Sequence, residues 1–143
     1  MRTFLTLLAL AFLVVPVSAQ DWALEELESS PRHHEWAEVS YDGRTVHSFV
    51  TYPEVEDDAP AVIVIHENRG LTDWVRLFAD RLAAEGYITI APDLLSGFDG
   101  EHERTSEFAS SDAPWDAIDP LDGEQLIADL QAVRSYVAEL PAA

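Results

Sequence analysis

Two short apolar runs separated by one amphipathic segment constrain the fold of this chain more than any other feature. Residues 61–65 are apolar without alternation, which is typical of a strand that helices cover on both faces, and residues 87–91 form a second strand-like run that we expect to be buried. Between them, residues 72–85 carry apolar side chains at helical spacing, and Gly86 follows as a helix stop. The sequence therefore predicts a strand, a helix and a parallel strand, with residues 61–65 as a central strand of the sheet.

An antiparallel hairpin is predicted ahead of this unit. Residues 36–41 and 44–52 are both rich in strand-forming side chains. Asp42-Gly43 between them is a strong hairpin signal, because glycine tolerates the positive φ that a tight turn requires. The sheet should therefore open with two antiparallel strands.

A second amphipathic helix is predicted over residues 122–140, and Asp122 with Gln125 resembles a capping box at its start. In a parallel sheet such a helix leads back to a further strand, yet the sequence stops at Ala143. We therefore expect an α/β fold with a mostly parallel but incomplete sheet. The long connection over residues 94–121 favours a partly ordered flap over the site.

The N-terminal residues are typical of a secretory signal peptide. A basic start precedes an apolar run over residues 4–15, and Val17-Ser18-Ala19 matches a small-residue cleavage pattern, which gives a signal peptide over residues 1–19. We expect export to the periplasm or the extracellular space, with no membrane contact after cleavage. Residues 20–35 are polar and acidic, so we expect a linker with little order, followed by one domain over residues 36–143.

Composition limits the partners of the chain. The formal charge of −19, from 27 acidic and 8 basic residues, argues against nucleic acid as a partner. The sequence contains no cysteine, so disulfides cannot support the fold. The repeated glycines of a phosphate-binding loop do not follow the first apolar strand, and the histidines lack the spacing of a metal site. We therefore predict no cofactor and no metal.

A polar turn follows the first apolar strand and contains His66, Glu67, Asn68 and Arg69. In open parallel sheets, ligands bind in the crevice outside the carboxyl ends of the strands. Glu67 is therefore a candidate catalytic carboxylate. The alternative is that Glu67 only caps the turn or pairs with Arg69 at the surface.

Several segments together resemble the dienelactone hydrolase family of α/β hydrolases. They are residues 62–71, 80–87 and 91–94, and residues 128–137 are similar to the helix that precedes the nucleophile strand in that family. The resemblance covers residues 36–143. It implies an α/β-hydrolase fold of which this chain holds the N-terminal portion, without the nucleophile-elbow strand and everything after it.

The resemblance implies a hydrolase that acts on a small-molecule ester or lactone through a covalent acyl-enzyme. It implies that Glu67 supports the nucleophile and that the backbone N–H of Asn68 belongs to an oxyanion hole. His66 and Arg69 would contact the substrate. The glycine-flanked Cys or Ser nucleophile, and the Asp and His that follow it in the family, are not found in this sequence. We therefore expect the chain to be inactive by itself.

A non-catalytic, exported α/β module that binds a small molecule or a partner chain is the alternative function. In such a module the unpaired sheet edge beside the last helix would need a cover, because exposed strand edges pair with other strands. Self-association of two copies through this edge is accordingly a further expectation.

Overall fold

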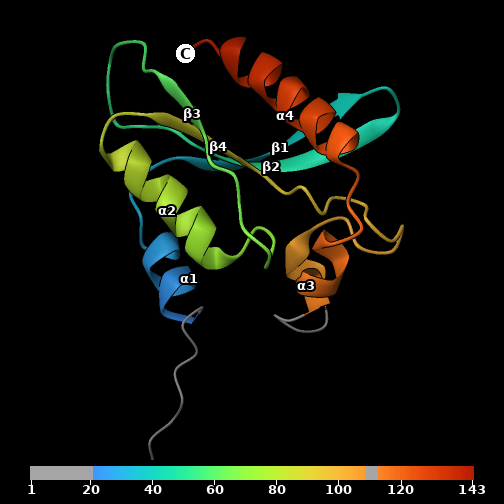
Figure 1. Cartoon of the computed structure of the whole chain (residues 1–143). Helices are drawn as coiled ribbons and strands as arrows, with labels where there is room; N and C mark the ends of the chain where they lie inside the picture. Colours follow the sequence, from blue (N-terminus) through green and yellow to red (C-terminus); the bar gives the residue numbers. More distant parts are fainter. Residues whose placement is uncertain (1–20, 109–112) are drawn as a thin grey trace, which may run out of the picture.

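The computed structural model describes residues 21–108 and 113–143, so the predicted signal peptide lies outside the described part. Figure 1 shows one sheet with α4 on one face and α2 and α1 on the other. The strands are β1 (His34–Tyr41), β2 (Arg44–Thr51), β3 (Ala61–Ile63) and β4 (Ile88–Pro92). The helices are α1 (Asp21–Glu28), α2 (Asp73–Ala84), α3 (Ala113–Ile118) and α4 (Gly123–Ala138), with a 3-10 turn, η1 (Thr105–Glu107). The predicted α/β class is confirmed.

β1 and β2 form the predicted antiparallel hairpin, in which Tyr41 pairs with Arg44 across the turn. Asp42 and Gly43 have φ values of 45° and 82°. Two consecutive residues with positive φ give a turn whose twist matches that of the flanking strands. The local chemistry of Asp42-Gly43 therefore sets the register of the whole hairpin.

β3 and β4 are parallel neighbours joined by α2, as predicted. The prediction that residues 61–65 form a central strand is wrong, because the strand order is β1-β2-β4-β3 and β3 lies at an edge of the described sheet. Val62 packs with the helices of one face and Ile63 with α4 on the other. An unbroken apolar run therefore indicates that helices cover both faces of a strand. It does not indicate whether the strand has a neighbouring strand on one side or on both. The β1-β2 and β2-β4 pairs are antiparallel, so parallel pairing does not predominate here.

The hydrophobic core has one half on each face of the sheet. On the face of α1 and α2 it includes Ala23, Leu27, Phe49, Leu77 and Ala91. On the face of α4 it includes Val46, Val50, Ile90, Val133 and Val137. All five residues of β4 are buried, since this strand lies between β2 and β3 and beneath helices on both sides.

The prediction of little order over residues 20–35 is wrong for the part that the structure describes. α1 packs on α2, with Ala23 and Leu27 buried and the rings of Trp22 and Trp74 5.7 Å apart between centroids. An isolated eight-residue helix is marginal in water, so the order of α1 comes from this docking. Ala23 and Leu27 are four positions apart, which is a helical spacing, but the acidic composition of the segment favoured the prediction of a linker.

Asp80 on α2 joins the segment after α1 to the domain. Its buried carboxylate accepts hydrogen bonds from Ser30 Oγ at 2.7 Å and Arg32 Nε at 2.8 Å, and it contacts His34 Nε2 at 2.7 Å. Burial by itself would raise the pKa of Asp80, but these hydrogen bonds outweigh it and hold the pKa below its ordinary value.

α4 confirms the second predicted helix, and Asp122 caps it by accepting from the backbone N–H of Glu124 at 3.0 Å. The predicted capping box is wrong, because the Gln125 side chain donates to Tyr41 Oη and to Asp129 instead. None of the helices in residues 21–108 and 113–143 is long and apolar enough to cross a bilayer.

Candidate functional site

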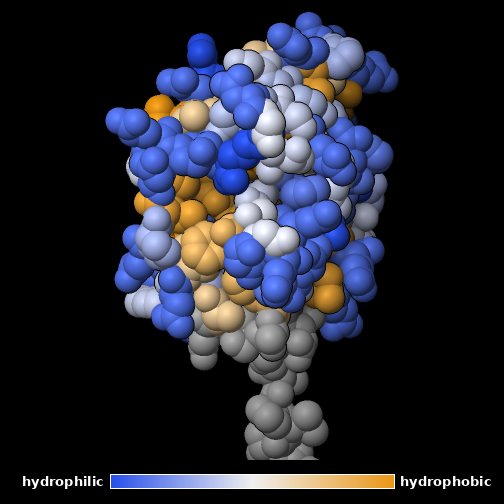
Figure 2. All heavy atoms as spheres, turned by 90° about the vertical axis from the view of Figure 1, so that its right-hand side faces the viewer, coloured by the Kyte–Doolittle hydropathy of each residue, from blue (hydrophilic) through white to orange (hydrophobic). Residues whose placement is uncertain are grey.

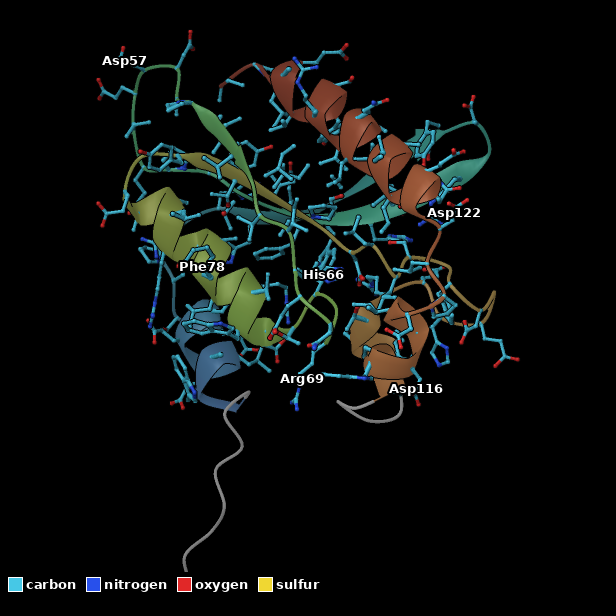
Figure 3. The ribbon with its side chains drawn as sticks, viewed as in Figure 1. Asp57, His66, Arg69, Phe78, Asp116 and Asp122 are labelled. Carbon is cyan, nitrogen blue, oxygen red and sulfur yellow. The ribbon has the colours of Figure 1, made fainter. Side chains whose placement is uncertain are left out.

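The strand-end turn, residues 66–71, follows β3 beside the segment that follows β4. Val64 N donates to Ile90 O at 2.9 Å, so the two strands remain paired until both leave the sheet at the same end. Figure 3 shows His66 directed into the molecule and Arg69 at the outer end of the turn. The structure therefore places His66, Glu67, Asn68 and Arg69 on one short turn at the carboxyl end of the parallel pair.

Exposure differs along the strand-end turn. Glu67 and Arg69 are exposed and Asn68 is half-buried, whereas Gly70 is buried. The carbonyl of Glu67 accepts from Gly70 N at 3.1 Å, which closes the turn, and Gly70 has a φ of 71°. Glu67 therefore presents a solvent-accessible carboxylate next to the half-buried residue whose N–H was predicted to bind an oxyanion.

His66 holds the beginning of the turn. Its side chain is 1% exposed. Its Nδ1 lies 2.8 Å from the carbonyl oxygen of Glu67, and its Nε2 accepts from Leu94 N at 3.0 Å. Only the neutral ring with its proton on Nδ1 satisfies both contacts. Burial lowers the pKa of His66, although the Glu67 carbonyl and the Asp93 carboxylate partly oppose this shift.

Asp93 directly follows β4, and its buried carboxyl group lies near His66, with 4.0 Å between Asp93 Oδ1 and His66 Nε2. Its Oδ1 accepts from Thr105 Oγ1 at 2.7 Å and from Leu95 N at 3.2 Å. Its Oδ2 accepts from Thr105 N at 2.6 Å. Sequence reasoning gave Asp93 no role, although its place directly after a buried strand, in the run that resembles the family, was a signal that could have identified it.

Thr105 joins the end of the strand-end turn to this carboxylate. Its Oγ1 accepts from Leu71 N at 3.1 Å while donating to Asp93. A Cβ atom on Gly70 would lie 2.7 Å from Thr105 Cγ2, so the two segments meet at a distance that only glycine permits. Sequence reasoning missed Thr105, because a single threonine in a long connection carries no pattern.

The predicted flap over residues 94–121 is ordered where the structure describes it. Leu94, Leu95 and Ser96 are buried, and η1 and α3 follow. Figure 1 shows α3 near the end of the sheet at which β4 leads into this connection. Residues 109–112 lie outside the described residues.

The hydroxyls of Ser96 and Ser135 form hydrogen bonds with residues other than Glu67. Ser96 Oγ is buried, donates to the carbonyl of Asp93 at 2.6 Å and accepts from His47 N at 2.9 Å. Ser135 lies on α4 and donates to the carbonyl of Gln131 at 3.0 Å. Neither hydroxyl is presented to Glu67.

Three surface clefts lie away from the strand-end turn. A cleft of about 240 Å³ lies between α1 and β1, and one of about 540 Å³ lies between β1 and α4. A third, of about 380 Å³, lies at the hairpin turn and is lined by Arg44, His47, Ser96 and Glu103 among others. The Glu67 carboxylate is thus displayed on an exposed surface and not in any of these three clefts.

Comparison with known proteins gives a consistent assignment. A model of the dienelactone hydrolase family matches residues 46–143, which is more than half of the chain. A protein of Escherichia coli K12 described as a hydrolase fragment, YghX, is 34% identical over 46% of this chain and 73% of its own length. A protein of Saccharolobus solfataricus described as a carboxymethylenebutenolidase is 34% identical over 72% of this chain and 42% of its own length.

Solved structures agree with the fold. A Klebsiella pneumoniae protein described as a dienelactone hydrolase superposes with a TM-score of 0.64 at 24% identity, over 78% of this chain and 46% of that one. An acylaminoacyl peptidase of Pyrococcus horikoshii superposes with a TM-score of 0.51 at 15% identity. This chain thus spans less than half of the Klebsiella and Saccharolobus proteins. From the match over residues 46–143, the chain belongs to the dienelactone hydrolase family.

Proposed function

We propose that this chain supplies part of the acyl-transfer site of a hydrolase that acts on ester or lactone bonds of small molecules. The observation that carries the proposal is the placement of Glu67 and Asn68 on a turn held at both ends, at the carboxyl end of β3, in a chain of this family. A carboxylate in that place can hold the proton of a nucleophile. A backbone N–H beside it can stabilise the negative oxygen that forms when the nucleophile adds to a carbonyl carbon.

The other residues of the turn take different parts in this proposal. Arg69, exposed at the outer end of the turn, would contact an acidic group of the substrate. For His66 we propose a supporting role in place of the predicted substrate contact, because its ring is buried and both ring nitrogens have partners. The nucleophile itself would come from residues other than Ser96 and Ser135, so we propose that the chain by itself has no esterase activity.

A chimaeric protein tests the proposal. It joins residues 20–143 to the portion of the Klebsiella protein that the structural match does not cover. The chimaera should hydrolyse p-nitrophenyl acetate, whereas the 143-residue chain should not. Glu67→Gln should lower kcat of the chimaera by about 10²-fold or more, because a positioned acid or base typically contributes that much. Glu56→Gln, at an exposed acidic residue of the β2-β3 loop, is the matched control and should leave kcat unchanged.

The oxyanion role of Asn68 has a test of its own. Asn68→Pro removes the backbone N–H and should lower kcat of the chimaera by about 10²-fold to 10³-fold, while Asn68→Ala keeps the N–H and should not. A folded chimaera that hydrolyses the ester equally well with Glu67→Gln and Asn68→Pro would contradict the proposal.

The alternative function, a binding module for a partner chain, is favoured by the open edge of β3, meaning the side of β3 that faces away from β4. Ile88 N donates to Pro60 O and Val64 N donates to Ile90 O, so the even-numbered residues of this segment face β4. In a parallel pair the N–H and C=O of alternate residues point to opposite sides, which leaves those of Ala61 and Ile63 on the open edge.

Apolar side chains accompany these backbone groups. Ile65 is 58% exposed directly after β3, and Ile127 on α4 is 59% exposed. Figure 2 shows that apolar side chains gather in one area of the surface with hydrophilic side chains around it. We therefore propose that two copies of the chain associate through the open edge of β3.

Sedimentation analysis over a range of protein concentrations tests this association. A concentration-dependent dimer should form, and Ile65→Lys should abolish it by placing a charge on the open edge. Val55→Lys alters a residue of similar exposure, 52%, in the β2-β3 loop and should leave the dimer intact. A wild-type protein that stays monomeric at high concentration would rule out association through this edge.

We also propose that the chain is exported, on the strength of the apolar run over residues 4–15 and the small residues that follow it. α1 begins at Asp21, two residues after the predicted cleavage position. N-terminal sequencing of the protein recovered from outside the cytoplasm should begin at Gln20. A full-length cytoplasmic protein would contradict export.

A further inference from the structure

The hydroxyl of Thr105 lies where three segments meet, and both of its hydrogen-bonding functions are in use. Thr105 is 7% exposed. Its Oγ1 has one proton, which it donates to Asp93 Oδ1 at 2.7 Å, and it accepts from Leu71 N at 3.1 Å. A hydroxyl with its proton committed to a carboxylate can offer Leu71 only its lone pair. The orientation of the hydroxyl is therefore determined by Asp93.

The Asp93 carboxylate binds both the backbone N–H and the side-chain hydroxyl of Thr105. The second carboxylate oxygen, Oδ2, accepts from Thr105 N at 2.6 Å, and Asp93 is 1% exposed. Hydrogen bonds to a buried carboxylate are shorter and stronger than those between neutral groups. Thr105 is thus attached to the end of β4 and cannot shift independently of it.

The strand-end turn is therefore held at both ends by the segment that follows β4. At its beginning, the ring of His66 lies between the Glu67 carbonyl and the Leu94 N–H. At its end, the Leu71 N–H donates to Thr105. The residues between these two contacts are Asn68, Arg69 and Gly70, which include the backbone N–H that we propose as the oxyanion donor.

We infer that Thr105 is a positioning residue. It fixes the position of the strand-end turn relative to the end of β4, and so the direction of the Asn68 N–H. The catalytic consequence rests on the proposed function, because donors to an oxyanion act only when they are aligned in advance. The effect of Thr105 on the position of the turn does not rest on the proposed function. Loss of the Thr105 hydroxyl should release the turn whether or not the site catalyses a reaction.

The shape of Thr105 and its hydroxyl can be separated by substitution. Thr105→Val keeps the branched shape and removes the hydroxyl, whereas Thr105→Ser keeps the hydroxyl and removes the methyl group. A residue that only fills space should tolerate valine at least as well as serine. A residue that positions the turn should be rescued by serine alone.

Amide hydrogen exchange of the 143-residue chain provides the test. In Thr105→Val, exchange of the Leu71 amide should rise at least tenfold, with faster exchange at Asn68 and Gly70 as well. Exchange at Val133 in the core of α4 reports global unfolding and should rise far less. Thr105→Ser should stay within threefold of the wild type at every one of these amides.

Thr45→Val is the matched control. Its Oγ1 lies 3.0 Å from Ser40 Oγ on the hairpin, so the variant also loses a hydroxyl contact, but away from the turn. It should leave the exchange of Leu71 unchanged. Equal acceleration of Leu71 and Val133 in Thr105→Val would overturn the inference, because Thr105 would then be an ordinary part of the core.

The wild type alone also tests the inference if Thr105→Val fails to fold. Its Leu71 amide should exchange slowly, although it lies in a loop, and fast exchange there would overturn the inference without any variant. None of these measurements requires turnover. A chimaera without hydrolysis would therefore refute the proposed function, and the exchange of Leu71 would still decide the role of Thr105.

Discussion

Arg44 and Asp129 form a bidentate ion pair that joins the hairpin to α4. Arg44 Nε lies 2.7 Å from Asp129 Oδ1, and a terminal guanidinium nitrogen lies 2.8 Å from Oδ2. Asp129 is fully buried. Its hydrogen bonds raise the pKa of Arg44, and burial together with its hydrogen bond raises the pKa of Tyr41 to about 12. The positive φ values of Asp42 and Gly43 place Tyr41 and Arg44 opposite each other, and both reach the same carboxylate.

Arg44→Met should lower the free energy of unfolding by about 3–5 kcal/mol, because it leaves the carboxylate of Asp129 buried without its cation. The double variant Arg44→Met/Asp129→Leu should be more stable than Arg44→Met alone, since no unpaired charge is left in the core. Urea unfolding followed by circular dichroism measures both. A double variant that is less stable than Arg44→Met would show that the pair is not the source of the loss.

Gly70→Ala should be more damaging than Gly97→Ala, although both glycines have positive φ, 71° and 63°. Each substitution places a Cβ in the left-handed region, at a cost of about 1–2 kcal/mol. The Cβ at position 70 also overlaps Thr105, which adds about 1–3 kcal/mol, whereas the Cβ at position 97 meets open space. Thermal unfolding of the two variants should separate them, and equal midpoints would contradict the close approach of Gly70 to Thr105.

Asp80→Asn should lower the free energy of unfolding at neutral pH by about 1.5–3 kcal/mol, the typical value of hydrogen bonds to a charged group. The folded state lowers the pKa of Asp80, so its contribution is fully present above the unfolded pKa and is lost as the pH falls through the folded pKa. The difference from the wild type should therefore shrink below about pH 4. Unfolding by urea at neutral and acidic pH checks this, with exposed Asp57→Asn as the control. If the stability difference between the wild type and Asp80→Asn stayed constant with pH, the lowered pKa of Asp80 in the folded state would be contradicted.

His66→Gln should remove part of the pH dependence of stability. The folded state lowers the pKa of His66, so on acidification the unfolded chain takes up this proton first and the wild type loses stability below about pH 6.5. The variant should lose less stability than the wild type over the same range. His33→Gln, at a largely exposed ring, should retain the wild-type slope. Parallel pH profiles for the wild type and His66→Gln would show that His66 does not resist protonation.

Local chemistry made a large part of the fold predictable. Asp42-Gly43 specifies a turn by its own backbone preferences, and α2 begins at Asp73, directly after its N-cap Thr72, and ends shortly before Gly86, close to the range that its pattern indicated. The position of Glu67 followed from a general rule about strand ends and needed no tertiary contact. These features depend on neighbours in sequence, which is the information that a single sequence contains.

The features that sequence reasoning missed depend on contacts between distant residues. Thr105 meets Leu71 across 34 positions of the chain, and no spacing rule links the two. The edge position of β3 depends on the order of the strands in the sheet. The apolar side chains of β3 indicate only that helices cover both faces of the sheet. α1 is ordered by α2, with which it shares no sequence pattern.

The two outer strands of the described sheet differ in the side chains that they display. β1, at one side, carries the exposed Glu38 and the half-exposed Glu35, while β3, at the other, is short and apolar. If two copies join along β3, both outermost strands of the resulting eight-stranded ribbon are β1 strands with these acidic groups. A further copy that presented its own β1 to this ribbon would bring like charges opposite each other, and this repulsion disfavours growth by pairing of β1 with β1.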